Sequence, residues 1–172
     1  MHHHSPGRHH PRPRRRALLP RLLCAPFALI LLAAGPGGSG ETIPLDGQRS
    51  GARLDVTLTR VVDPAVPATD GTGTGAERLV SVTLRLENTG TVPYEDSPAP
   101  ATHLLDTDGR RFTGTDEPTP AGAGFPAPLV LAPGDSADGS VTFRLPSDAR
   151  PAAVQFALDA GLADDVGHWG LP

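Results

Sequence analysis

The sequence predicts an all-β protein, an antiparallel β-sandwich of about seven or eight strands, on three observations. Beyond residue 40 of the 172, short segments alternate apolar and polar residues, which is the pattern of strands with one buried face. Turn-forming residues separate these segments at intervals of roughly ten residues. No window combines the apolar period of a helix with suitable end residues. We expect residues 1–40 to be a targeting segment and residues 41–172 to form one domain.

Each expected strand is placed by its alternating or apolar run. In chain order these runs are 54–58, 80–86, a short extended piece at 92–94, then 103–105, 110–112, 129–131, 141–145, 153–158 and 166–171. Asn88-Thr89-Gly90 supplies a turn after the second run. Asp106-Thr107-Asp108-Gly109 predicts a hairpin between the 103–105 and 110–112 runs, with Gly109 in the strained position. Pro133-Gly134 fits the centre of a type II turn.

The first forty residues have the features of an export signal. Arg12-Pro13-Arg14-Arg15-Arg16 is a cationic start, and an apolar run of 13 residues from Leu22 to Ala34 follows it. As a helix this run would reach roughly 20 Å, which is short of a hydrocarbon core of about 30 Å. A cleaved signal peptide is therefore expected. An uncleaved N-terminal membrane anchor is the alternative.

Two details leave the export route open. Arg15-Arg16-Ala17-Leu18-Leu19 is similar to the core of a twin-arginine signal, although arginine pairs are common in such segments. Cys24 lies inside the apolar run, where it does not fit the position of a lipidated cysteine. No other cysteine occurs in the sequence, so the exported domain is expected to fold without disulfides.

The charge of the expected domain argues against nucleic acid as a partner. All 19 Asp and Glu lie at or after Glu41, where only nine Arg and no Lys occur, so this part has a formal net charge of −10. Such a surface repels phosphate backbones. The abundance of Arg, Ala, Gly and Pro without Lys is typical of high-G+C bacterial genomes, including actinobacterial ones.

The order of several segments resembles a known family. The segments are 80–90, ending in Asn-Thr-Gly, 104–112 around Asp-Thr-Asp-Gly, 131–135 with Ala-Pro-Gly-Asp, and 139–146. Together they are similar to the telokin-like family of secreted Gram-positive domains, which is related in architecture to mycobacterial immunoprotective extracellular proteins. The resemblance covers roughly residues 54–158. It implies an immunoglobulin-like fold, export, an unassigned function and no established catalytic residues.

A serine hydrolase is one alternative function. Gly134-Asp135-Ser136 has a sequence found around some nucleophilic serines, and His103 and His168 are the only histidines beyond Glu41. A nucleophilic serine needs a base within hydrogen-bonding distance and an acid that orients the base. The sequence contains no strand-to-helix elbow and no oxyanion-hole loop around Ser136, so a turn serine is the preferred interpretation.

A calcium-stabilised envelope module is the other alternative. Asp106 and Asp108 begin like a calcium loop, but no Glu follows at the required spacing, which excludes an EF-hand. Other acidic residues could still join in space, namely Asp116, Glu117, Asp164 and Asp165. Copper transport would need methionine and histidine ligands, and Met1 is the only methionine.

The preferred function is therefore a non-catalytic, extracellular binding or interaction module without a cofactor or metal. The partner is expected to be a protein, an envelope component or a small ligand, with membrane contact only through an uncleaved N-terminus. The expected binding surfaces are the loops 63–76 and 113–128, because irregular loops on a rigid scaffold commonly carry recognition. Each loop is expected to be dispensable for stability. Trp169 is expected to close one end of the core, with an exposed anchor for a partner or sugar as the alternative. Tyr94 has the same two interpretations.

Overall fold

The computed structural model describes Met1, residues 40–65 and residues 77–172. The described residues form an antiparallel β-sandwich with two four-stranded sheets. In the first sheet the strand order is β1-β2-β3-β8, with bounds Thr42–Asp46, Arg53–Val62, Glu77–Asn88 and Ser136–Pro146. In the second it is β10-β9-β5-β6, with bounds Val166–Gly170, Pro151–Ala157, Thr102–Asp106 and Arg111–Thr113.

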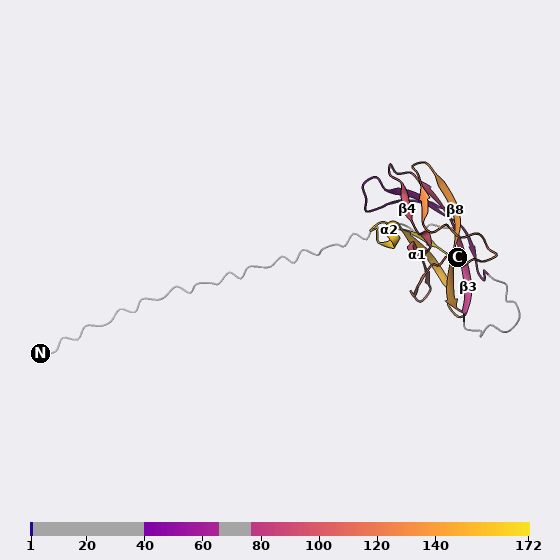
Figure 1. Ribbon diagram of the computed structural model, residues 1–172. Coiled ribbons are helices and arrows are strands. Elements are labelled where there is room, and N and C mark those ends of the chain that lie inside the picture. The colour runs from indigo at the N-terminus through magenta and orange to yellow at the C-terminus, as the bar shows by residue number, and fades with distance from the viewer. Residues whose placement is uncertain (2–39, 66–76) are drawn as a thin grey trace. The chain divides into compact units, whose positions relative to one another are not determined.

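Four smaller elements complete the described structure. Strands β4 (Tyr94–Asp96) and β7 (Leu129–Leu131) pair as a separate two-stranded sheet. The short helices α1 (Pro98–Ala101) and α2 (Leu158–Gly161) contact each other (Figure 1). In the part of the chain that the structure describes, neither helix has the length and hydrophobicity to cross a membrane.

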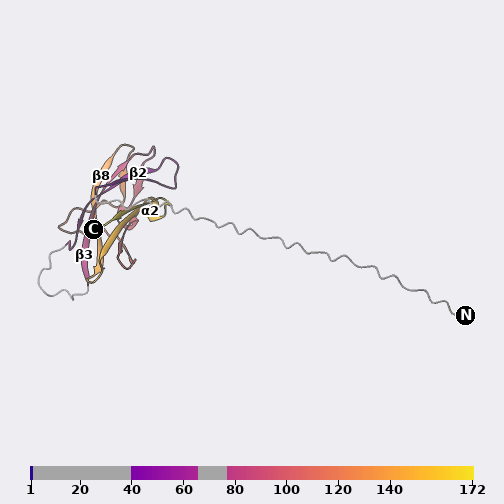
Figure 2. The same cartoon turned by 180° about the vertical axis from the view of Figure 1, so that it is seen from behind.

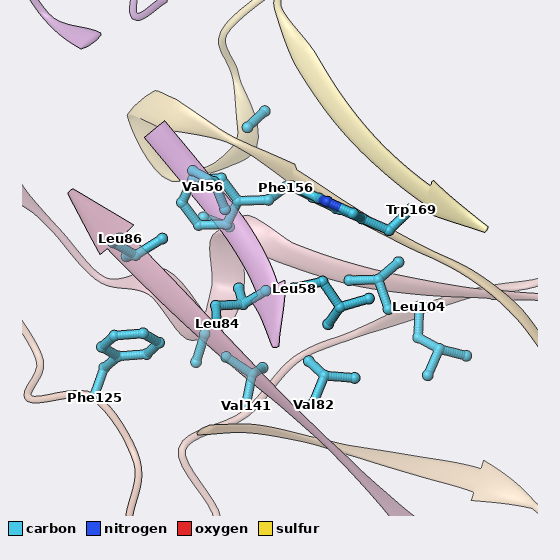
Figure 3. Packing of buried hydrophobic residues seen from close by; sticks show 14 of the residues in the cluster. Val56, Leu58, Val82, Leu84, Leu86, Leu104, Phe125, Val141, Phe156 and Trp169 are labelled. Carbon is cyan, nitrogen blue, oxygen red and sulfur yellow. The ribbon is translucent and has the colours of Figure 1, made fainter. Parts of the chain in front are cut away.

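The core fills the space between the two principal sheets. The inward residues of β2 and β3 alternate with outward polar ones, as the period-two pattern predicts. Figure 3 shows Leu58, Leu84 and Val82 packed near residues of the opposite sheet, among them Phe156 and Trp169. Trp169 is fully buried and its indole Nε1 donates to the Glu41 carbonyl at 2.9 Å. The all-β sandwich expected from the sequence is confirmed, and Trp169 lies in the core.

The expected extended piece at 92–94 is shifted, because the observed strand β4 is Tyr94–Asp96. The structure also has elements that the sequence did not predict, in two places. Strand β1 was not predicted, because Pro44 interrupts a short run. Among the described strands β1 pairs with β2 alone, and proline is tolerated on such an edge strand. The two short helices were also not predicted, since four residues are too few for a periodic pattern. The β5–β6 hairpin and its turn lie where the sequence placed them.

One edge of the first sheet is covered by the segment 114–128. In Figures 1 and 2, β3 and β8 lie side by side. The segment pairs with the edge of β8 that faces away from β3. The amide and carbonyl of Thr115 both form hydrogen bonds with Thr142, and the Ala123 carbonyl accepts from the Ser140 amide. An uncovered edge strand can pair with another chain, so this segment protects β8.

Candidate functional site

The two loops expected to bind a partner have different outcomes. Residues 66–76 of the first loop lie outside the described residues. At its start, Asp63 is bound in a bidentate ion pair by Arg78, with distances of 2.7 and 3.0 Å. Arg78 also donates to the carbonyls of Pro146, Ser147 and Ala149. The described base of this loop is therefore a structural anchor.

The second loop is part of the fold rather than a free surface. Phe125 is only 8% exposed and belongs to the core cluster. A Cβ atom added at Gly139 would lie 2.5 Å from the Phe125 ring, so the ring packs directly on the β8 backbone. Glu117 adds an ion pair to Arg144 at 2.8 Å, and its carbonyl accepts from the Thr142 hydroxyl. The expectation that this loop is dispensable for stability does not agree with this packing.

Ser136 and the two histidines are placed on different sheets. Ser136 is exposed at the start of β8, and its hydroxyl accepts from Arg85 at 2.9 Å. His103 and His168 lie in the second sheet, in one cross-strand row with Gln155 between them. Gln155 contacts the His168 Nδ1 atom at 3.3 Å. Burial, and then the charge of Arg111, lower the pKa of His103. The described contacts do not join Ser136 to a base.

The acidic residues considered for calcium are also separated. The Asp106 side chain is fully buried and accepts from the amides of Asp108 and Arg110 and from the Arg110 guanidinium. Burial alone would raise the pKa of Asp106, but these hydrogen bonds outweigh it and hold the pKa below its usual value. Asp165 accepts from the Asp46 amide. Among the described residues, no group of three potential metal ligands comes together.

A cavity that the sequence did not predict is the best candidate site. It has a volume of about 160 Å³ and lies where three distant segments meet: the 47–53 turn, the chain from 88 to 96, and α2. Its lining comprises Arg49, Ala52, Arg53, Asn88, Val92, Pro93, Tyr94, Glu95, Asp96, Leu158, Asp159 and Ala160. This cavity is called the Tyr94 cavity below.

Tyr94, which lines this cavity, has a hydroxyl that is both unsatisfied and inaccessible to solvent. Its side chain is 7% exposed, and its hydroxyl has no hydrogen-bond partner among the described residues. Burial, and then the nearby charges of Asp96 and Asp159, raise the pKa of Tyr94 far above its usual value, so the hydroxyl keeps its proton. A buried donor without an acceptor destabilises the fold. Such a group is uncommon in native proteins and calls for an explanation.

The backbone of α2 adds strain to the same wall. Asp159 and Ala160 have φ angles of 57° and 56°, and Gly161 follows with 82°. This left-handed conformation costs roughly 1–2 kcal/mol for a residue other than glycine. It is held in place by hydrogen bonds: the Ala160 amide donates to Asp96 at 2.6 Å, and the Gln48 amide donates to Asp159 at 2.6 Å. Strained residues of this kind cluster at functional sites.

The charges around the cavity are only partly paired. Arg53 forms an ion pair with Asp46 at 3.3 Å. Arg49 donates to the Pro93 carbonyl but has no carboxylate within ion-pair distance among the described residues. Glu95 and Asp159, within the same described ranges, have no cationic partner. The cavity thus carries free charge of both signs.

A second hollow is larger but less specific. It has a volume of about 330 Å³ and lies between α1 and the covering segment of β8. Prolines and Phe125 form much of its lining, and Asp116 is its one charged residue. It offers few groups that could orient a ligand, so we take the Tyr94 cavity as the candidate site.

Sequence reasoning missed the Tyr94 cavity for a clear reason. Tyr94 was noted only as a residue that could be either core or surface. The segments that surround it are far apart in the chain: the hydrogen bond from Arg49 to Pro93 spans 44 positions, and the one from Gln48 to Asp159 spans 111. The predicted turn at Asn88 was the one sequence feature that pointed to this region. The Asn88 side chain donates to the Val92 and Leu131 carbonyls and so fixes the start of β4 beside the cavity.

Comparisons with known proteins agree with the fold. No protein-family model and no curated protein matches this chain. The solved structure of the secreted protein MPT63 from Mycobacterium tuberculosis is similar, with a TM-score of 0.57 and 13% identity over 81% of this chain and 100% of MPT63. The yjhA protein of Bacillus subtilis has a TM-score of 0.50 and 13% identity over 79% of this chain and 99% of its own.

A third similar structure belongs to a larger protein. The ycdA protein of Bacillus subtilis has a TM-score of 0.52 and 14% identity, and the match covers 74% of this chain but 38% of ycdA. At such identities the similarity establishes a shared β-sandwich fold and does not extend to function.

Proposed function

We propose that this protein is a non-catalytic, exported, immunoglobulin-like module of the telokin-like class, and that it binds a small ligand in the Tyr94 cavity. The observation that carries the proposal is a cavity formed where three distant segments of the chain meet. The strain in α2 and the unpaired charges at the rim point to the same place.

Export is supported by the N-terminal sequence, with its basic start and short apolar run. The similar structure of MPT63 is described as that of a secreted protein. We expect the mature protein to begin close to residue 41. N-terminal sequencing of protein recovered from the culture medium tests this; full-length protein found only in the membrane fraction would indicate an uncleaved anchor instead.

The absence of catalysis is tested by active-site labelling. We expect a fluorophosphonate probe to leave the protein unlabelled, because the Ser136 hydroxyl is bound by Arg85 and the histidines lie in the other sheet. Ser136→Ala is the matched control. Labelling of the wild type that disappears in this variant would establish a serine hydrolase and overturn the proposal.

Binding is tested by the melting temperature of the purified chain with a panel of small polar compounds. A ligand at tenfold its Kd raises the Tm by about 3–6 °C for a domain of this size. We expect at least one compound to do so for the wild type and to bind Arg49→Gln more weakly, because Arg49 lines the cavity. A complete panel without any shift would remove the proposed site.

A further inference from the structure

The outer edges of the two principal sheets are protected to different degrees. The far edge of β8 is covered by the segment 114–128, and β6 is a strand of 3 residues that carries the exposed Arg111. Short strands, charged side chains and covering segments all hinder the pairing of an edge with another chain. The remaining edges are β1 in the first sheet and β10 in the second.

Strand β1 is protected by its own sequence and by a residue beside β10. In an antiparallel ladder every second residue directs its backbone groups away from the neighbouring strand. The register of β1 with β2 gives this outward position to Thr42, Pro44 and Asp46. Pro44 has no amide hydrogen, and the Asp46 amide donates to Asp165 Oδ2 at 2.9 Å. Two of the three outward positions of β1 therefore offer no free amide to a partner strand.

Strand β10 has none of these protections. The Leu171 amide donates to the Ala152 carbonyl, in register with the β10–β9 pairs. By the same alternation, the amides and carbonyls of Val166, His168 and Gly170 point away from β9. Among the described residues, no hydrogen bond occupies these outward groups. The strand also contains no proline and no Lys, Arg, Asp or Glu.

Within the described part of the chain, the free edge of β10 is open to a partner. Val166 is 40% exposed, and His168 and Gly170 are half-buried. Gly167 faces the core instead, where an added Cβ atom would lie 3.2 Å from Leu45 Cδ1 of β1. Side chains project from the faces of a sheet, whereas neighbouring strands add in its plane. Leu45 therefore packs on the inward face of β10 and leaves its edge clear.

A second copy of β10 complements this edge. Antiparallel pairing about a two-fold axis at His168 places the two His168 residues opposite each other and Val166 opposite Gly170 of the partner copy. The outward backbone groups of the two strands then face one another, and each opposed pair can exchange two hydrogen bonds. The exposed Val166 side chain lies beside Gly170, which has no side chain to obstruct it. The two edges thus match in hydrogen bonding and in shape.

Charge also favours a second copy at this edge. With neutral histidine, no side chain of β10 is charged, so two copies meet there without direct like-charge repulsion. Residues 41–172 have a formal net charge of −10, and Asp164 and Asp165 precede the strand, so the copies repel each other at longer range. Salt screens this repulsion. The contact is also small beside the about 20–30 residues per partner of stable complexes, so the dimer is weak and reversible.

We propose that β10 pairs with β10 of a second copy, in an antiparallel register centred on His168, and that the second sheet thereby continues across a weak two-fold dimer. This inference is independent of the ligand proposed for the Tyr94 cavity. It involves no covalent step.

The first test is sedimentation velocity of the full chain at concentrations from about 10 μM to about 1 mM, the range suited to a small interface. We expect a dimer whose fraction rises with concentration and rises further when NaCl is increased from about 0.05 M to about 0.5 M. A chain that remains monomeric at about 1 mM and high salt overturns the proposal.

Amide hydrogen exchange locates the interface on the wild-type chain. The amides of Val166, His168 and Gly170 are expected to exchange at least about threefold more slowly at the concentration that gives the dimer. The amides of Gly167 and Trp169 are bonded to β9 and should change little. Equal changes at all five positions, or none, overturn the proposal. If the chain stays monomeric but an extended lysine-rich peptide protects the three outward amides, the edge accepts a foreign strand and the second-copy proposal is wrong.

Variants at the two-fold axis test the register. His168→Lys and His168→Glu each place like charges opposite each other, and each is expected to weaken the dimer by about threefold or more. An equimolar mixture of the two variants should restore association, because Lys then lies opposite Glu. Thr113→Lys is the matched control: it changes the net charge equally and lies in the same cross-strand row as His168, but on β6 at the opposite edge.

These variants also exclude other modes of association. Association through residues 1–40 would be the same in every variant, so a dimer that His168→Lys leaves unchanged contradicts the proposal. A loss in Thr113→Lys equal to that in His168→Lys, or a mixture of the Lys and Glu variants that does not associate, contradicts the register. The exchange measurement needs no substitution and decides the question if a variant does not fold.

Discussion

The turn after β5 and the turn after β9 both contain left-handed backbone, but they place different residues in it. In the first, Gly109 takes the left-handed position with φ of 78°, and Asp106 satisfies the surrounding amides. In the second, Asp159 and Ala160 take left-handed conformations although neither is glycine. The second turn borders a cavity with an unpartnered hydroxyl, whereas the first has its buried carboxylate fully hydrogen-bonded.

The first turn therefore stabilises the fold, whereas the second keeps a strained backbone and an unsatisfied hydroxyl, both of which lower the free energy of unfolding. Polar groups that are buried and satisfied hold the fold together and tolerate little change. Strain and unsatisfied donors lower stability, and they persist where function requires them. Substitutions in the first region should therefore destabilise the protein, while selected substitutions at the cavity should stabilise it.

The largest expected loss follows Phe125→Ala in the segment that covers β8. Phe125 is 8% exposed and packs on Gly139, and removal of a buried phenylalanine ring costs about 3–5 kcal/mol. Urea denaturation measures the free energy of unfolding. Pro126→Ala, at the exposed neighbouring residue, is the control and should stay close to the wild type. A loss below about 1 kcal/mol for Phe125→Ala would restore the view that this loop is dispensable.

A smaller loss is expected for Arg78→Ala. This side chain donates to Asp63 and to the Pro146, Ser147 and Ala149 carbonyls. With Arg78 and Asp63 only 23% and 26% exposed, we expect a loss of about 2–3 kcal/mol by the same denaturation measurement. Arg85→Ala is the control, because Arg85 and Asp138 are 45% and 57% exposed, and exposed pairs contribute about 0–1 kcal/mol. Equal losses in the two variants would contradict the anchoring role of Arg78.

A pH-dependent loss is expected from Asp106. Its pKa in the folded protein lies below its ordinary value of about 3.9. The unfolded chain therefore binds a proton first as the pH falls, and the stability that Asp106 contributes is present above about pH 4 and is lost as the pH falls through its lower folded pKa. Asp106→Asn should be less stable at pH 7 and should show a flatter stability profile below about pH 4. An unchanged slope would assign acid unfolding to other carboxylates.

The sequence was sufficient for the stable region and insufficient for the cavity. Alternation in β2, β3 and β8 identified the inward residues, and Asp106 to Gly109 identified the hairpin turn, because these signals are local in the chain. The role of Phe125 was missed because a Pro- and Gly-rich segment has no period that shows which residue points inward. Tyr94 and Asp159 come together only through the tertiary fold, so no spacing in the sequence could predict their proximity.

The smallest effect, with the opposite sign, is expected for Ala160→Gly. Ala160 has φ of 56°, and glycine adopts this conformation without the steric penalty of a Cβ atom. After subtraction of the greater entropy of glycine in the unfolded chain, we expect a gain of about 0.5–1 kcal/mol in the free energy of unfolding. The Ala160 amide, which donates to Asp96, is kept in this variant, so the wall of the Tyr94 cavity should keep its shape.

Gly161→Ala provides the reverse of this substitution. Gly161 has φ of 82°, and an alanine there should destabilise the protein by about 1 kcal/mol or more. A gain in one variant and a loss in the other would show that the left-handed turn itself stores strain. If Ala160→Gly gave no gain, the hydrogen bonds from the Ala160 amide to Asp96 and from the Gln48 amide to Asp159 would already compensate the backbone strain. The contrast between the two turns would then rest on the Tyr94 hydroxyl alone.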